Sequence, residues 1–166
     1  MIHDNSQQNE SASTESSIRV GACGWDHAHW QGTFYPDDLP DEWRLNYYAN
    51  EFSTVLITED AWRSKLEKLD EWIEEVPEGF LFYLQSSVDE PPELVQIKAQ
   101  LGECFAGILS ATSTAVMIEF SSKSLREWRE WLEQNASQLR AIFITDENLS
   151  VKKLSEFKSL VEILNL

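Results

Sequence analysis

The sequence predicts an α/β fold in which short strands alternate with amphipathic helices around a mainly parallel sheet. From residue 18 onward, short runs of β-branched and aromatic residues are separated by stretches whose apolar side chains recur every three or four positions. The strand candidates are mostly apolar along their length, as expected for strands that are covered on both faces. This alternation indicates β/α units within one domain.

Five strands are well marked and a sixth is weaker. Their expected ranges are 18–23, 54–58, 80–85, 115–120 and 140–145, with a short sixth candidate at 161–164. Residues 106–114 fit either a short strand with a turn or a loop, because the run is too brief for periodicity to decide.

Helices are expected between these strands, at 42–52, 63–76, 91–105, 124–135 and 150–160. Pro40 precedes the first helix and Pro77 ends the second, since proline cannot continue a helix. Ser124 and Ser150 are suited to accept hydrogen bonds from the free backbone N–H groups at the start of the last two.

Composition excludes several classes of function. The 166 residues include 13 Lys and Arg against 29 Asp and Glu, which gives a formal net charge of −16. This balance repels phosphate backbones and anionic lipid surfaces, so neither nucleic acid nor a membrane is an expected partner. Cys23 and Cys104 lack metal-ligand spacing, and residues 1–17 lack an export signal, so a cytoplasmic protein with reduced thiols is predicted.

The polar segment 1–17 contains almost no apolar side chain, and ordering it would cost backbone entropy with little burial in return. We therefore expect a disordered tail over 1–17 and a single folded domain over 18–166.

The most specific pattern lies between Gly21 and Ile57, where aromatic residues, Gly and Pro recur at fixed, non-periodic offsets. The segment reads GACGWDHAHWQGTFYPDDLPDEWRLNYYANEFSTVLI. It resembles the opening of the YecE-like proteins, domain of unknown function 72 (DUF72), in its G-W, W-x-G-x-F-Y-P, L-P, W and Y-Y-A elements. The resemblance extends more loosely through PEGFLFYLQSS (77–87) and IEF (118–120). It implies a TIM-barrel-like fold and no settled reaction.

A full barrel of eight β/α units needs about 250 residues, so this chain is too short for one. It passes almost directly from LGECFAGILSATS to AVMIEFSS, as if a β/α portion of the family were missing. We therefore expect a shortened barrel of five or six β/α units, which need not close. Its free sheet edges would be covered by the segment VEILNL, by the tail, or by a second copy in a homodimer.

Polar and aromatic side chains at the carboxyl ends of the strands are the candidates for a functional site, because those ends meet at one edge of a parallel sheet. The candidates for catalysis are Glu119 and Asp26. The candidates for ligand binding are Trp25, His27, His29, Trp30, Glu59 and Asp60.

The resemblance also implies losses at this edge. Where relatives carry an acid and an amide at the end of the second strand, this chain has Leu56 and Thr58; where they carry Lys and Arg after later strands, it has Gln85 and Ser121. Missing cations remove the electrostatic reason to expect an anionic ligand there. We therefore predict a non-catalytic protein that binds a small molecule or another protein.

The alternative is a hydrolase or isomerase that uses Glu119 and Asp26 as acid and base, with His27 or His29 assisting. The two histidines, with Glu59, Asp60 or Glu119, could also complete a divalent-metal site. A histidine in a loop is more often solvated or hydrogen-bonded, so we predict neither a metal nor a cofactor.

Most of the aromatic residues suit a structural role, although together they could stack a sugar or a base. Trp25 and Trp30 are the exceptions that we expect to shape a pocket, because they flank the end of the first strand. Trp128 and Trp131 lie three residues apart on one helix, so one of them should be partly exposed.

Overall fold

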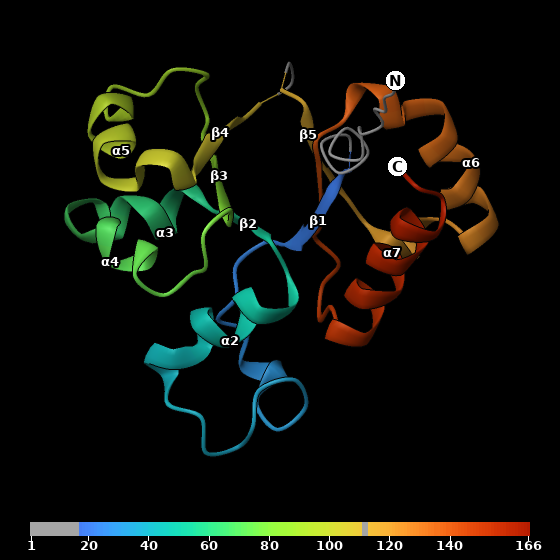
Figure 1. Cartoon of the computed structure of the whole chain (residues 1–166), viewed down its shortest axis with the longest axis horizontal. Helices are drawn as coiled ribbons and strands as arrows, with labels where there is room; N and C mark the ends of the chain where they lie inside the picture. The colour runs from blue at the N-terminus through green and yellow to red at the C-terminus, as the bar shows by residue number, and fades with distance from the viewer. Residues whose placement is uncertain (1–16, 111–112) are drawn as a thin grey trace, which may run out of the picture.

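The strands of this protein are all parallel and form two separate hydrogen-bonded sheets (Figure 1). The computed structural model describes residues 17–110 and 113–166. One sheet has the order β1 (Arg19–Ala22), β6 (Ala141–Ile144), β5 (Ala115–Ile118). The other has the order β2 (Thr54–Ile57), β3 (Leu81–Gln85), β4 (Phe105–Leu109). The architecture is therefore mixed α/β with parallel sheets.

The two sheets meet along a seam between β1 and β2. A single bridge joins Cys23 to Leu56 there, and the Gly24 amide donates a hydrogen bond of 2.8 Å to the Leu56 carbonyl. Nearer the amino ends, the buried Tyr48 hydroxyl lies between the strands. It accepts from the Ala22 amide at 2.9 Å and donates to the Thr54 carbonyl at 2.8 Å. One side chain thus satisfies the backbone groups where the strands diverge.

Helices follow the strands along the chain. The α-helices are α2 (Arg44–Glu51), α3 (Glu59–Ser64), α4 (Asp70–Ile73), α5 (Leu94–Leu101), α6 (Leu125–Asn135) and α7 (Val151–Ile163). The short 3-10 helices are η1 (Ala28–Trp30), η2 (Asp41–Trp43), η3 (Leu66–Lys68), η4 (Gly102–Cys104), η5 (Phe120–Ser122) and η6 (Ala136–Gln138). Figure 1 shows α3, α4 and α5 beside the β2–β4 sheet, and α6 and α7 beside the sheet that contains β1.

The helices pack on one face of the sheets and make the main core. Alternate strand residues such as Val20, Val55 and Ile142 belong to the same buried cluster as the helix residues Trp62 and Phe157. The intervening strand residues point the other way and form a second, smaller cluster. In that cluster Tyr83 of β3 and Phe143 of β6 meet edge to face at 5.3 Å between ring centroids, so the inner faces of the two sheets face each other.

The described strands do not close into a barrel. β4 and β5 are each the outer strand of their sheet, and neither pairs with the other among the residues that the structure describes. The edges that a shortened barrel was expected to leave free are therefore those of β4 and β5.

Most of the expected elements are confirmed. All five well-marked strands form, and the ambiguous segment 106–114 contributes most of β4. Ser124 and Ser150 accept hydrogen bonds of 3.2 Å from the backbone amides three residues later, as capping residues do. The sixth strand candidate at 161–164 is wrong, because these residues form the end of α7 and a turn. Val161 is buried in the main core there.

The expected single helix over 63–76 is also wrong. The segment is divided into the end of α3, η3 and α4, with a non-helical backbone at Lys65. Side chains of α5 satisfy the backbone groups that the interruption frees: the Gln100 amide group donates to the Leu66 carbonyl, and its oxygen accepts from the Leu69 amide at 2.9 Å. A tertiary contact therefore overrides the local helical pattern.

Several other expectations can be placed. Trp128 is buried and Trp131 is half-buried, as their spacing predicted. Cys23 and Cys104 are both free thiols. Within the described residues, none of the helices has the length and apolar character that crossing a bilayer requires. The predicted tail lies outside the described residues except for Ser17.

Candidate functional site

A pocket of about 330 Å³ opens at the carboxyl ends of β1 and β2. It is lined by Cys23, Gly24, Trp25, Asp26, His27, Ile57, Thr58, Ala61, Ser64, Lys65 and Trp72. Three of the residues expected at a site, Trp25, Asp26 and His27, lie together here. We call this the Trp25–Trp72 pocket.

Two tryptophans from distant segments give this pocket a rigid aromatic wall. The rings of Trp25 and Trp72 meet at right angles with centroids 5.2 Å apart, and Trp72 also stacks on Phe82 of β3 at 5.8 Å. Gly24, with φ of +81°, turns the chain directly after β1 and so sets the direction of Trp25. The Trp25 carbonyl accepts a hydrogen bond from the Tyr35 hydroxyl, which fixes the backbone beneath the ring.

Asp26 lies at the rim of this pocket and is paired with a cation. Its carboxylate forms an ion pair with Arg44 at the start of α2, and this hydrogen bond raises the pKa of the Arg44 guanidinium. Arg44 also contacts Asp41 and Gln31. The Asp26 side chain is 69% exposed and that of Arg44 only 11%, so a solvated carboxylate pairs with a largely buried guanidinium and positions the loop after β1.

His27 is a neutral hydrogen-bond donor in the pocket wall. Its Nε2 lies 2.9 Å from the Cys23 carbonyl, and because a carbonyl can only accept, Nε2 carries the proton. Burial lowers the pKa of His27, although the hydrogen bond to Cys23 partly opposes the shift, and the nearby His29 lowers the pKa further. The ring also packs against Trp30, with centroids 4.5 Å apart.

This depressed pKa predicts a loss of stability in mild acid. Below the unfolded-state pKa of about 6.5 the unfolded chain protonates His27 while the folded chain does not, so stability falls as the pH drops toward the folded pKa. We expect the difference in unfolding free energy between pH 7.5 and pH 5.5, measured with urea, to be smaller in His27→Gln than in the wild type. His29→Gln is the matched control, and an equal pH dependence in wild type and His27→Gln would contradict the prediction.

His29 and Trp30 belong to a neighbouring cavity of about 370 Å³ at the start of α7. His29 Nε2 and Trp30 Nε1 both donate to the Leu149 carbonyl, at 2.6 and 2.8 Å. The Trp30 side chain is only 1% exposed and packs in the main core against Tyr35 and Tyr48. Trp30 therefore does not line the Trp25–Trp72 pocket.

Across residues 17–110 and 113–166, no group of three or more His, Cys, Asp or Glu side chains is arranged to hold a metal ion.

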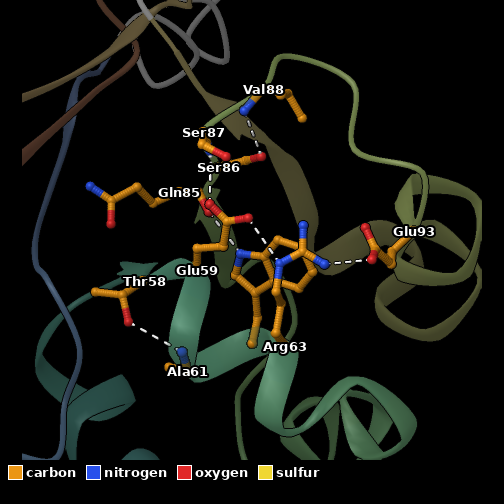
Figure 2. A network of polar contacts seen from close by, with 10 residues as sticks. Thr58, Glu59, Ala61, Arg63, Gln85, Ser86, Ser87, Val88 and Glu93 are labelled. Atoms are coloured by element: carbon orange, nitrogen blue, oxygen red, sulfur yellow. Dashed lines mark hydrogen bonds and ion pairs between the residues drawn. The ribbon is translucent and has the colours of Figure 1, made fainter.

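Glu59 is part of a polar network that ties α3 to the segment after β3 (Figure 2). One carboxylate oxygen accepts from Arg63 at 2.8 Å and the other from the Ser87 amide at 2.8 Å. Arg63 and, less strongly, the Ser87 amide lower the pKa of Glu59. Arg63 also pairs with Glu93, so its guanidinium bridges two carboxylates. Asp60, the next residue, is exposed.

Glu119 lies apart from the Trp25–Trp72 pocket. It follows β5, is exposed, and is not among the residues that line the pocket, whereas Asp26 is. Its side chain makes no hydrogen bond or ion pair with any residue in the described part of the chain. The two predicted catalytic carboxylates therefore do not share this pocket.

Comparison with known families gives the decisive observation. Residues 19–89 match the model of a family described as "Protein of unknown function DUF72". Residues 19–89 of this chain are therefore a DUF72 segment. Among solved structures it is similar to a DUF72 family protein from Thermotoga maritima, with 19% sequence identity and a TM-score of 0.41 over 76% of this chain. The match covers 55% of that protein, so this chain spans about half its length. No curated protein matches the chain.

All residues that line the Trp25–Trp72 pocket fall inside the segment that matches DUF72, and Glu119 falls outside it. Sequence reasoning missed Trp72, Ser64 and Lys65, which enter this pocket because the chain turns at Lys65 instead of continuing as one helix. A tryptophan in the acidic run DEWIEE, off the expected apolar face of 63–76, was the available signal for Trp72.

Proposed function

We propose that this DUF72 protein is a non-catalytic binding protein that takes a small, planar, largely apolar ligand in the Trp25–Trp72 pocket. The observation that carries this proposal is the pair of perpendicular indole rings in a pocket of about 330 Å³. That volume lies at the small end of the range for ligand sites, and aromatic walls with few polar groups are typical of them.

The polar groups of the pocket favour binding over catalysis. Asp26 is paired with Arg44, and the proton on His27 Nε2 is donated to a backbone carbonyl. The Thr58 hydroxyl accepts from the Ala61 amide at the start of α3 and keeps its own proton to donate. Thr58 and Lys65 would thus orient a ligand at the rim, while the indole rings would supply most of the contact area.

A direct test uses the chain labelled with 5-fluorotryptophan and titrated with indole as the probe. We expect indole to shift the fluorine signals of Trp25 and Trp72 in a saturable way. Trp72→Leu should weaken binding roughly threefold to tenfold, as expected when one aromatic contact is lost. Trp43→Leu is the matched control, because Trp43 is exposed and lies outside the pocket. Indole shifts that are absent, or that Trp72→Leu leaves unchanged, would rule out the pocket as the site.

The enzymatic alternative, with Glu119 and Asp26 as acid and base, stays a prediction. Nothing in the geometry of the described residues favours it over binding, because Glu119 is exposed and does not line the pocket that contains Asp26.

We also propose that the fold is a shortened TIM barrel and that the protein forms a homodimer. The strand order β4-β3-β2 and β1-β6-β5, with β1 beside β2 and helices on one face, supports the first proposal. The edges of β4 and β5 support the second, because strand edges without a partner favour pairing with another chain.

A further inference from the structure

A second cavity, of about 890 Å³, lies at the opposite ends of the strands from the Trp25–Trp72 pocket. Its walls include residues at or beside the amino ends of all six strands, among them Arg19, Ser53, Leu81, Ala106, Thr114 and Arg140. Residues near the end of α7 complete it. We call it the amino-end cavity.

The charge of this cavity is opposite to that of the protein. The chain as a whole carries −16, yet the cavity is lined by the three cationic side chains of Arg19, Arg140 and Lys158. One acidic side chain borders it: Glu162 lies 4.0 Å from Lys158 and offsets that charge. The two guanidinium groups remain, so the cavity is locally cationic in an acidic molecule.

The two arginines are held differently. Arg19 donates through one terminal nitrogen to the Ser53 carbonyl at 3.2 Å and to the Gly79 carbonyl at 2.9 Å, which fixes its guanidinium at the seam. Arg140 is exposed, and its guanidinium makes no hydrogen bond or ion pair with another residue in the described ranges. A fixed and a free guanidinium that line the same cavity suit an anion that accepts hydrogen bonds from both.

A tyrosine adds a further polar group to this cavity. Tyr83 lines the cavity from the inner face of β3 and is largely buried. Its hydroxyl makes no hydrogen bond with the described residues. Burial raises the pKa of Tyr83, and the charges of Arg19 and Arg140 oppose this, as expected if both guanidinium groups lie near the phenol. Val20, Leu81 and Ala106 supply apolar walls around these donors.

We propose that the amino-end cavity binds a small molecule bearing a phosphate or carboxylate group, with Arg140, Arg19 and the Tyr83 hydroxyl as donors. This site is independent of the function proposed for the Trp25–Trp72 pocket.

The proposal is tested with the full chain labelled with ¹⁵N-arginine, titrated with inorganic phosphate and, in a second series, with acetate. Sodium chloride at matched ionic strength is the reference in both. We expect saturable shifts of the Nε–Hε signals of Arg140 and Arg19 with at least one of the two anions, and none for Arg126, which lies on α6. Arg140→Gln should weaken binding at least tenfold without lowering the Tm, because this side chain makes no contact that the fold needs. Arg126→Gln is the matched control.

The two titrations also distinguish the chemistry of the ligand. Shifts with phosphate alone assign a phosphate site, and shifts with both anions assign a general carboxylate and phosphate site. Shifts that equal those in sodium chloride, or binding that Arg140→Gln leaves unchanged, would overturn the proposal. Since Arg19 also holds the seam, Arg19→Lys is used only as a second variant, with its Tm measured alongside.

Discussion

Replacing Gly21 with alanine is expected to lower the free energy of unfolding by about 3 kcal/mol, as an overpacked core substitution does. Gly21 lies on β1 at the seam, and a Cβ atom there would approach the Thr54 carbonyl oxygen to 2.3 Å and the Thr54 carbonyl carbon to 3.0 Å. The first contact is closer than real Cβ atoms approach and the second is tight, and both involve backbone that a rotamer change cannot move. The seam would have to open, which would also disturb the hydrogen bonds of the Tyr48 hydroxyl. Urea unfolding measures the change.

Gly79→Ala is the matched control for this prediction. Gly79 has φ of +92°, but nothing lies within 4 Å of the position that its Cβ would occupy. Its substitution should cost only about 1 kcal/mol, from the backbone conformation alone. If Gly21→Ala were no more damaging than Gly79→Ala, the close approach of β1 and β2 would not exist as described.

Replacing Trp30 with alanine is expected to cost about 3–5 kcal/mol, the usual range for deleting a fully buried aromatic side chain. Trp30 packs against Phe34, Tyr35 and Tyr48, and its indole nitrogen donates to the Leu149 carbonyl. This contact ties the loop after β1 to the segment before α7. The expected result is a large fall in Tm. In the labelled wild type, indole should leave the fluorine signal of Trp30 unchanged.

Trp43→Ala provides the comparison, because Trp43 is 59% exposed. Its loss should change the free energy of unfolding by no more than about 0.5 kcal/mol, as surface substitutions do. A Trp30→Ala protein as stable as Trp43→Ala would show that Trp30 does not pack in the core, and would restore the expectation that it shapes a ligand site.

The strands could be predicted because each is a short apolar run whose pattern depends on few neighbours. The errors occurred where distant contacts decided the structure. Residues 63–76 have a helical period, but Gln100 and the buried Leu69 hold them in a divided form. Residues 161–164 have β-branched and apolar side chains, yet Val161 packs as part of α7. Local preference is a weak signal beside such packing.

The candidate site was predicted only in part. Trp25, Asp26 and His27 follow one strand, so their proximity could be inferred from sequence. Their partners could not be inferred, because Arg44 and Trp72 reach them from other helices. The amino-end cavity was missed for a related reason. Arg19 begins β1 and Arg140 precedes β6, two strands that are far apart in the sequence, and only their parallel pairing brings these residues to one place.

That pairing also sets an order for the folding of the nascent chain. β2, β3 and β4 are consecutive neighbours, so their sheet can form as soon as residue 109 has left the ribosome. β1 is synthesised before them but pairs with β6, the last of the described strands to emerge. Until then the apolar side chains of Val20 and Ala22 lack their final partners. The strand that carries Gly21 can thus make its seam contacts with Tyr48 and Thr54 early, but its own sheet is completed only when β6 is available.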